Sequence, residues 1–370
     1  MINRRIGLAL SGGGVRAMAF HAGILKFLAE NNCLEKIKYI STVSGGTLLI
    51  GLIYTLNNNK WPTSEEYLKM HNEIEEILSK KPLLSFASIV KYILNPLRWY
   101  SLLRNRRSII STLIFKQWGA KSSFADLGSD ITWDICATIK ETGNRWKIQR
   151  NSMGDYSVGY TTSNDMSLAD LMSISACVPM AIGKYKLKID KYEWAHKEEY
   201  SAPEHRGKFK YVTLVDGGVY DNLGLESLYD IGKNSIKGSC DSDFIIVSDA
   251  SAPLKVRSGV ITAWRLLDIT MLNINRLRMR NIIPYFIRNN NGIFIKLGSS
   301  PSKIISEASK DNNLNIPEDI KNGKFHSEKH LETIKNYKTS LSKVSKDDFK
   351  LLSDHGYELC KILYSTITNV

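Results

Sequence analysis

The first sixty residues contain the pattern that most restricts how this chain of 370 residues folds. An apolar run over 6–10 leads directly into Ser11 and three consecutive glycines, and apolar residues at helical spacing follow over 15–31. A second apolar run over 38–43 leads in the same way into a helical pattern over 48–56. Two successive units of a short buried strand, a tight turn and a helix predict a parallel sheet covered by helices, and therefore an α/β fold.

The rest of the chain alternates between predicted strands and helices, which favours one large α/β domain over residues 1–370. Residues 84–118 are apolar and basic without an acidic residue, and with an amphipathic helix over 63–80 they predict a helical insertion at about 57–120. The polar stretch over 289–323 is predicted to be surface loop around one strand. The remaining predicted strands cover 131–139, 211–215, 244–247 and 293–296. Two of the remaining predicted helices cover 167–177 and 260–280. The last two, over 328–343 and 346–366, form the C-terminal helical region at about 328–366.

The excess of basic over acidic residues limits the kinds of partner that the protein is expected to bind. Lysine and arginine number 50 against 37 aspartate and glutamate residues, which gives a net charge of +13. Such an excess favours contact with an anionic partner, namely nucleic acid, a phospholipid surface or a phosphorylated ligand.

Hydropathy and cysteine usage indicate a cytoplasmic protein. No apolar run approaches the roughly 18–20 residues of a membrane-spanning helix. Glycines and Arg16 interrupt the N-terminal apolar run before it resembles a signal peptide. The five cysteines are widely spaced, with no CxxC pair and no metal-like Cys/His cluster, which predicts reduced thiols.

The glycine turn is the first of three segments from which an active site could be built at the carboxyl ends of strands. Its glycines expose backbone N–H groups at the start of a helix, where they can hold a phosphate or an oxyanion. Gly12, Gly14 and Ala17 also fit a dinucleotide fingerprint, but the second strand ends without the carboxylate that ribose binding needs. No Gly-Lys-Ser or Gly-Lys-Thr follows as in a P-loop. The alternative is a tight strand-to-helix turn without a ligand.

The second and third segments each present a side chain that suits acyl transfer. Ser44 lies between the second strand and the second helix and precedes two glycines, as in a nucleophile elbow. The alternative is a serine that only caps the helix. Asp216 ends a strand and precedes Gly217 and Gly218, where it can act as a general base or form an ordinary Asp-Gly turn.

One mechanism accounts for all three segments, because acyl transfer requires a nucleophile, a base and an oxyanion hole. In this interpretation Ser44 is the nucleophile and Asp216 is the base. The oxyanion is held by the amides of Gly12, Gly13 and Gly14. None of the seven histidines has a comparable setting, so nothing in the sequence indicates a Ser-His-Asp triad.

These motifs resemble those of the patatin-like phospholipase family, in particular of its bacterial members. The resemblance rests on the glycine loop with Arg16, on Ser44 with Gly46, on Asp-Gly-Gly at 216–218, and on small residues and a proline over 168–179. It implies a three-layer α/β/α fold with a mainly parallel central sheet. It also implies that a Ser–Asp dyad hydrolyses lipid esters without a metal or another cofactor.

The resemblance further implies a substrate and a set of supporting residues. The substrate would be a membrane phospholipid, cleaved at an ester bond by a phospholipase A or lysophospholipase activity. The residues that would support the site are Arg16, Gly46, Gly217 and Gly218. The chain departs from the family pattern at Thr42, where the elbow usually has its first glycine.

A basic and aromatic stretch over 91–107 is the predicted contact with an anionic membrane. Its candidate lipid contacts are Arg98, Trp99, Arg104, Arg106 and Arg107. An insertion helix with a solvated basic face is the alternative. Residues 269–306 form a second stretch that has basic but no acidic side chains. This stretch could bind anionic lipid, a phosphorylated ligand or a partner chain. Both stretches favour a cytoplasmic protein that is peripheral to the inner face of the membrane.

Two further functions stay open at this level. The resemblance extends to bacterial effectors whose membrane hydrolysis is gated by a nucleotide signal or a partner, for example in anti-phage defence. The other function is a non-catalytic basic protein that binds membranes. A nucleic-acid partner is not expected, because no helix-turn-helix, zinc or RNA-binding signature accompanies the charge.

Overall fold

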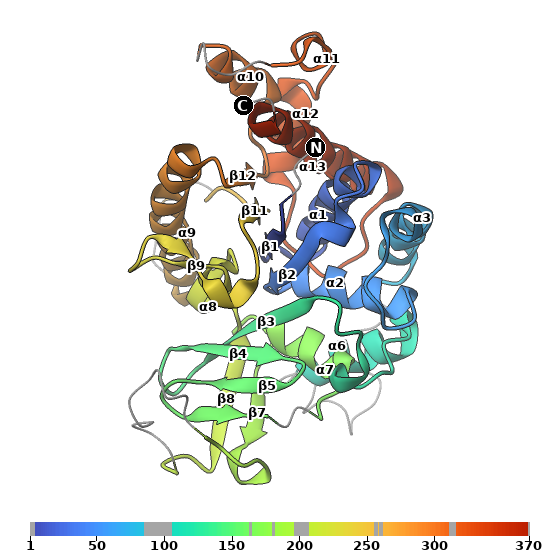
Figure 1. Ribbon diagram of the computed structural model, residues 1–370. Coiled ribbons are helices and arrows are strands. Elements are labelled where there is room, and N and C mark those ends of the chain that lie inside the picture. Colours follow the sequence, from blue (N-terminus) through green and yellow to red (C-terminus); the bar gives the residue numbers. More distant parts are fainter. Residues whose placement is uncertain are drawn as a thin grey trace.

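The computed structural model of the chain describes residues 4–84, 106–162, 165–179, 182–195, 207–254, 258, 262–310 and 316–368, without the side chains of residues 106, 264, 367 and 368. A central sheet lies between two helical layers (Figure 1). This arrangement confirms the predicted α/β fold. Among the helices described, none has the length and hydropathy that a membrane span requires.

Five adjacent strands at one end of the sheet run parallel to one another. Their residues are almost all buried, because helices cover both faces of this part of the sheet. In sheet order they are β12 (Gly292–Lys296), β11 (Phe244–Asp249), β1 (Ile6–Leu10), β2 (Ile37–Thr42) and β3 (Thr132–Ile139). The strands predicted from the two N-terminal units are therefore confirmed as neighbours in a parallel sheet.

An antiparallel extension continues the sheet beyond β3. The strands β4, β5 and β6 follow one another as hairpins, and β8 pairs with both β3 and β7. The bounds are β4 (Arg145–Gln149), β5 (Ser152–Asp155), β6 (Gly159–Thr161), β7 (Tyr185–Lys188) and β8 (Tyr211–Asp216). Only β8 is predicted from the sequence, because the other four are short and have polar side chains in many positions. A separate ribbon joins β9 (Tyr229–Asp230) to β10 (Ser235–Ile236).

The strands β2 and β8 lie along the same edge of β3, and their carboxyl ends face each other. Residues 132–135 of β3 pair with β2, and residues 137–139 of β3 pair with β8. The opposite edge of β3 takes β4, since Ala137 pairs with Trp146 as well as with Asp216. The carboxyl ends of β2 and β8 therefore converge on Cys136, which lies between the two paired segments.

The helices on one face of the sheet form the larger core. Figure 1 shows α1, α2, α3 and α13 on the same side of β1 and β2. The backbones of α1 and α13 cross so closely that a Cβ at Gly23 would lie 1.8 Å from the carbonyl oxygen of Ser353. The bounds on this side are α1 (Gly14–Glu30), α2 (Gly45–Leu56), α3 (Ser64–Lys80), α6 (Arg106–Leu113), α7 (Leu168–Ser175) and α13 (Lys346–Thr368).

A smaller core lies on the other face, beneath α9 (Ala263–Asn289) and the short helix α8 (Gly218–Asp221). The strand β1 serves both cores, because Leu8 faces the larger one and Ala9 the smaller one. The helix α9 runs nine residues further than the predicted end at residue 280.

The C-terminal region differs from its prediction in two places. The polar stretch predicted as surface loop contains α10 (Pro301–Ala308) and α11 (Glu318–Lys321). The helix α10 begins with a proline, which is favourable in the first turn because the missing N–H is not needed there. The helix α12 (Glu328–Asn336) ends seven residues before the predicted end at residue 343. The segment after Asn336 instead passes over the glycine loop.

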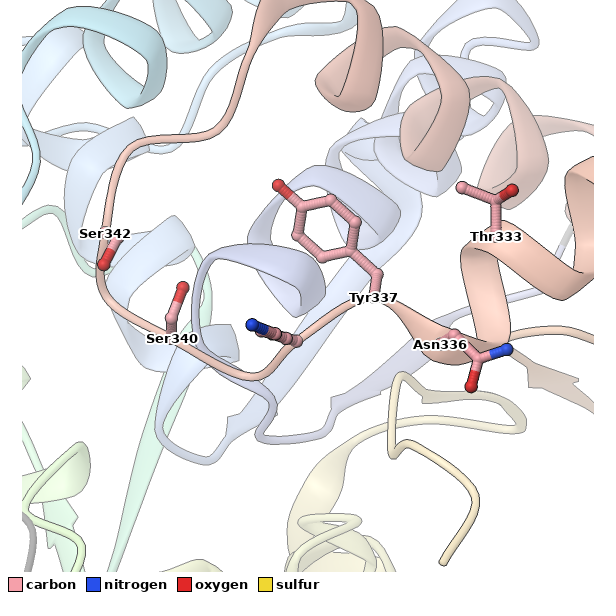
Figure 2. Close-up of a pocket in the computed structure, with 6 residues that line it drawn as sticks. Thr333, Asn336, Tyr337, Ser340 and Ser342 are labelled. Atoms are coloured by element: carbon pink, nitrogen blue, oxygen red, sulfur yellow. The ribbon is translucent and has the colours of Figure 1, made fainter. Parts of the chain in front are cut away.

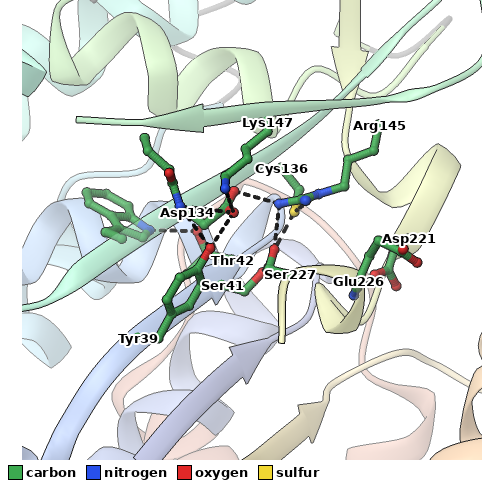
Figure 3. Close-up of polar contacts among 12 residues, drawn as sticks. Tyr39, Ser41, Thr42, Asp134, Cys136, Arg145, Lys147, Asp221, Glu226 and Ser227 are labelled. Carbon is green, nitrogen blue, oxygen red and sulfur yellow. Dashed lines mark hydrogen bonds and ion pairs between the residues drawn. The ribbon is translucent and has the colours of Figure 1, made fainter. Parts of the chain in front are cut away.

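A buried polar network joins β2, β3 and β4 beneath the point where β2 and β8 meet (Figure 3). The carboxylate of Asp134 has no exposed surface, and it accepts hydrogen bonds from Tyr39 Oη at 2.7 Å and from Arg145 Nη2 at 2.6 Å. Arg145 also donates to Ser227 and to Cys136 Sγ. Pairing within the network compensates for the burial of both charges, and removal of either partner would leave an uncompensated charge.

Candidate active site

Ser44 occupies a sharp turn between β2 and α2 with a backbone that few residues other than glycine adopt. Its φ is 48° and its ψ is −112°. Such a conformation costs about 1–3 kcal/mol and is retained where the surrounding structure enforces it. The hydroxyl makes no capping hydrogen bond with α2, so Ser44 does not serve as a helix cap. Gly46 lets the turn approach β1, because a Cβ there would lie 2.5 Å from the carbonyl oxygen of Leu10.

Ser175, at the end of α7, holds this turn in place. Its hydroxyl accepts the backbone N–H of Ser44 at 2.9 Å and donates to the carbonyl oxygen of Cys136 at 3.0 Å. The sequence gives no sign of this role for Ser175 beyond its place in the small-residue stretch over 168–179. Thr42 fits at the position of the missing glycine, because its hydroxyl accepts a hydrogen bond from Trp133 Nε1 at 2.8 Å.

Asp216 ends β8 with a carboxylate that is only 4% exposed. Its Oδ1 atom accepts the N–H of Gly218 at 2.7 Å. Within the described residues its Oδ2 atom is buried without a partner at hydrogen-bonding geometry, although the Ser44 hydroxyl is near enough to lower the pKa of the carboxyl group. Burial outweighs both effects and raises the pKa of Asp216 to about 7. Gly217 is required beside it, because a Cβ there would lie 2.4 Å from the carbonyl oxygen of Cys136.

The three glycines of the turn after β1 have different roles. The N–H of Gly12 donates to the carbonyl oxygen of Asn222 at 3.1 Å, so it is not available to an oxyanion. The expectation that Gly12 contributes an oxyanion-hole donor is therefore wrong. Within the described part of the chain, the N–H groups of Gly13 and Gly14 have no acceptor, and they lie at the N-terminus of α1. Among the glycines of this turn, Gly13 and Gly14 are therefore the candidate oxyanion donors.

The glycine turn and the serine turn lie against each other. A Cβ at Gly12 would lie 3.1 Å from Ser44 Cβ, and a Cβ at Gly45 would lie 2.8 Å from the nitrogen of Gly14. Each position therefore requires a residue without a side chain. A Cβ at Gly218 would also lie 3.0 Å from Asp216 Oδ1. The structure thus brings together the three segments that the sequence analysis singled out.

The segment after α12 packs against the glycine turn. The carbonyl oxygen of Ser340 accepts the N–H of Val15 at 2.9 Å. A hollow of about 530 Å³ lies on this segment (Figure 2). The residues that line it are Thr333, Asn336, Tyr337, Lys338, Ser340 and Ser342. Neither Ser44 nor Asp216 lines this hollow, so it is not the catalytic cavity.

Arg16 connects the glycine turn to two other segments. Its side chain is buried and donates from Nε to the carbonyl oxygen of Ala250 at 3.0 Å and from Nη1 to that of Tyr337 at 2.8 Å. Burial lowers the pKa of Arg16 to about 10, which still leaves it charged at neutral pH. His21 reinforces the same turn, since its Nε2 lies 3.0 Å from the carbonyl oxygen of Ser11 and its Nδ1 lies 2.7 Å from Ser248 Oγ.

Replacing Arg16 by methionine is expected to destabilise the protein by about 2–4 kcal/mol, because two buried carbonyl groups lose their donors. Ester hydrolysis should fall as well, since the glycine turn loses its attachment. Arg5→Met is the matched control, because the Arg5 side chain is 54% exposed. Urea unfolding of both variants measures the difference. Equal stability of the two variants would contradict the assignment of Arg16 as the attachment of the turn.

No histidine in the described residues forms a hydrogen bond with Ser44 or Asp216; His196 and His205 lie outside these residues. The described residues that could hold a metal ion are His326, His355 and Glu358, whose donor atoms lie within 4.8 Å of one another. The N–H of Gly298 donates to His355 Nε2 at 3.0 Å, so the neutral ring carries its proton on Nδ1. This proton leaves no free lone pair on the ring, and we assign no metal to the cluster.

The predicted lipid contacts fall into two groups. Arg98, Trp99 and Arg104 lie outside the described residues, as does the side chain of Arg106. Arg107 donates from Nη1 to Asp170 Oδ1 at 2.7 Å, and its side chain is 11% exposed. Its charge is neutralised within the protein, so the expectation that Arg107 contacts lipid is wrong.

Comparison with solved structures supports the fold. Over 99% of its length the chain is similar to human GIVD cytosolic phospholipase A2, with a TM-score of 0.53 and 12% identity, and this match covers 63% of the human chain. A structure of the same human protein in complex with methyl gamma-linolenyl fluorophosphonate gives a TM-score of 0.52 and 13% identity over 98% of this chain and 59% of the human one. The chain thus spans less than two thirds of that relative.

Comparison at the level of sequence gives the family. None of the curated protein sequences compared with the chain matches it. The family model described as patatin-like phospholipase matches residues 8–229, which is more than half of the chain. This range contains the glycine turn, Ser44 and Asp216. The chain belongs to the patatin-like phospholipase family.

Proposed function

We propose that this protein is a lipid acyl hydrolase of the phospholipase A or lysophospholipase type, which cleaves ester bonds of membrane phospholipids with Ser44 as nucleophile and Asp216 as base. One observation carries the proposal: a serine in a strained turn lies beside a buried carboxylate oxygen that has no other partner in the part of the chain that the structure describes. Membership of the patatin-like phospholipase family supports the substrate class.

The first step is acylation of Ser44. Asp216 Oδ2 takes the hydroxyl proton while Ser44 Oγ bonds to the acyl carbonyl carbon. The carbonyl oxygen becomes negative, and the amides of Gly13 and Gly14 stabilise it at the N-terminus of α1. The ester C–O bond then breaks, and the leaving alkoxide receives the proton from Asp216. The products are a fatty acyl ester of Ser44 and a lysophospholipid or another deacylated alcohol.

The second step releases the fatty acid. Asp216 takes a proton from water while the water oxygen attacks the acyl carbon, and the same two amides stabilise the second oxyanion. The bond between Ser44 Oγ and the acyl carbon breaks, and the proton on Asp216 returns to Ser44. The buried site limits access of bulk water, which strengthens each electrostatic interaction within it.

Labelling with an alkyl fluorophosphonate tests the proposed nucleophile directly. The phosphorus is attacked by an activated serine hydroxyl, so peptide mass spectrometry should locate a single adduct on Ser44. Loss of fatty-acid release from phospholipid vesicles should follow the extent of labelling. An adduct on another residue, or release that continues after complete labelling of Ser44, would overturn the proposal. Labelling in the presence of denaturant is the control for activation by the fold.

A further inference from the structure

The outer surface of α9 exposes an unusual amount of apolar side chain. Among the large apolar side chains in the described residues, the three most exposed are Ile287 at 77%, Leu277 at 64% and Leu266 at 57%, and all three belong to this helix. Single exposed apolar residues are common on protein surfaces, but three on one helix indicate a contact surface.

Basic side chains accompany these apolar residues on the same face. Arg276, Arg280 and Arg288 are exposed, whereas Arg278 points inward and pairs with Asp221 and Glu226. At 100° per residue, Leu266, Arg280 and Arg288 lie within about 60° of Leu277 around the helix axis. Ile287 lies about 80° and Arg276 about 100° from Leu277 in the same direction as Arg280, so these six residues span an arc of about 120°. The one acidic residue of α9, Asp268, lies on the opposite side of the axis from Leu277, and the next acidic residue in the sequence is Glu307. The outer face is therefore apolar and basic.

The inner face of the same helix contacts the catalytic segment. A Cβ at Gly218 would lie 3.0 Å from Met271 Cε, and Gly218 donates to Asp216. Asn275 Nδ2 donates to Ser251 Oγ at 3.1 Å, and that oxygen also accepts from Asn222 Nδ2 at 2.9 Å. In Figure 1, α9 lies beside α8, at the flank of the sheet opposite α1. The outer face is thus the far side of a helix whose inner face contacts the segment that carries Asp216.

We propose that the outer face of α9, defined as Leu266, Arg276, Leu277, Arg280, Ile287 and Arg288, docks on an anionic phospholipid bilayer. The inference rests on the proposed function, because it assigns the element that holds the hydrolase against its lipid substrate. The apolar side chains enter the boundary between headgroups and acyl chains, and the arginines pair with lipid phosphates.

The charge pattern favours a bilayer over a second copy of this chain. A symmetric dimer would place two identical faces together, with three arginines on each side and no acidic partner on either face. Like charges across such an interface repel. An anionic bilayer supplies both the opposite charge and an apolar layer.

Vesicle binding without turnover tests the inference. The parent protein for this experiment carries Ser44→Ala, so that hydrolysis does not consume the vesicles. Binding is measured by flotation with vesicles of phosphatidylcholine, with and without phosphatidylglycerol. We expect the double variant Leu277→Glu/Ile287→Glu to lose at least about tenfold in affinity for the anionic vesicles, and Arg276→Glu/Arg280→Glu to lose a similar factor. Leu68→Glu on α3 and Lys329→Glu on α12 are the matched controls and should bind like the parent.

Each outcome decides the question. Binding of both α9 variants that equals the parent's, or a parent that binds neither vesicle, would overturn the inference. A change of oligomeric state with unchanged vesicle binding would overturn it in favour of an interface between copies. If a glutamate variant fails to fold, as judged by thermal unfolding, Leu277→Ser/Ile287→Ser takes its place. Failure of the proposed function is seen separately, because the chain with Ser44 intact would then not hydrolyse a short soluble ester.

Discussion

Ser44→Ala is expected to lower kcat for ester hydrolysis by about 10⁴–10⁶-fold, because the proposed acyl intermediate forms on the Ser44 hydroxyl. Residual turnover would come from attack of water on an ester still held by the amides of Gly13 and Gly14. The binding of lipid should change little, so the loss should appear in kcat rather than in KM. Release of fatty acid from mixed phospholipid vesicles measures it.

Ser175→Ala is the matched comparison, because it removes a serine hydroxyl from the same site. Its hydroxyl holds the backbone of Ser44 and the carbonyl of Cys136, so its loss should reduce stability. The Ser44 hydroxyl holds no backbone group, and its removal should leave the thermal unfolding midpoint nearly unchanged. A Ser44→Ala protein that retains more than about one hundredth of the activity would show that another residue is the nucleophile.

The parts of the fold that could be predicted from sequence are those whose signals are local. The strand β1, the glycine turn and α1 are encoded within 25 consecutive residues, so their signals are local in the chain. Ser44 and Asp216 were identifiable for a similar reason, because each pairs a reactive side chain with adjacent glycines at the end of a strand. Both turns require glycine at positions where a Cβ would collide with backbone.

The parts that could not be predicted depend on partners far apart in the chain. The sequence places Asp216 at the end of a strand, but it does not show that β8 is antiparallel and meets β2 head to head. The N–H of Gly12 is taken by Asn222, which lies 210 residues later. Arg107 appears as a surface charge in the sequence, and only the packing of α6 on α7 brings it to Asp170. In each case, tertiary contact assigns the residue a role that its local pattern does not contain.

Asp216→Asn is the second substitution with a large expected effect on rate. Asparagine can still accept the N–H of Gly218 through Oδ1, so the local geometry is kept, but it cannot take the proton of Ser44. The loss in kcat should be about 10³–10⁴-fold. In the unaltered protein, kcat/KM should rise with pH through the pKa of about 7 and then level off, since only the carboxylate acts as base. A rate that is independent of pH between 5 and 8 would contradict the role of Asp216.

The same raised pKa predicts that this substitution stabilises the protein at high pH. Folding raises the pKa of Asp216 from 3.8 to about 7, so the folded state binds the proton more tightly than the unfolded state. Well below pH 3.8 both states hold the proton, so the titration of Asp216 adds no penalty to folding there. As the pH rises toward 7 the unfolded state loses the proton first, so stability falls until the full penalty, on the order of 4 kcal/mol, is reached above pH 7.

Asparagine does not titrate, so Asp216→Asn removes this penalty. Its gain in unfolding free energy over the unaltered protein should therefore be small at pH 5 and larger at pH 8, as measured by urea unfolding of both proteins at each pH. Ser44→Ala keeps the carboxyl group and should show no such gain, which separates the effect from mere loss of activity. An equal difference at both pH values would mean that Asp216 titrates in its ordinary range. A base that destabilises the fold when charged is consistent with selection for catalysis rather than for stability at this position.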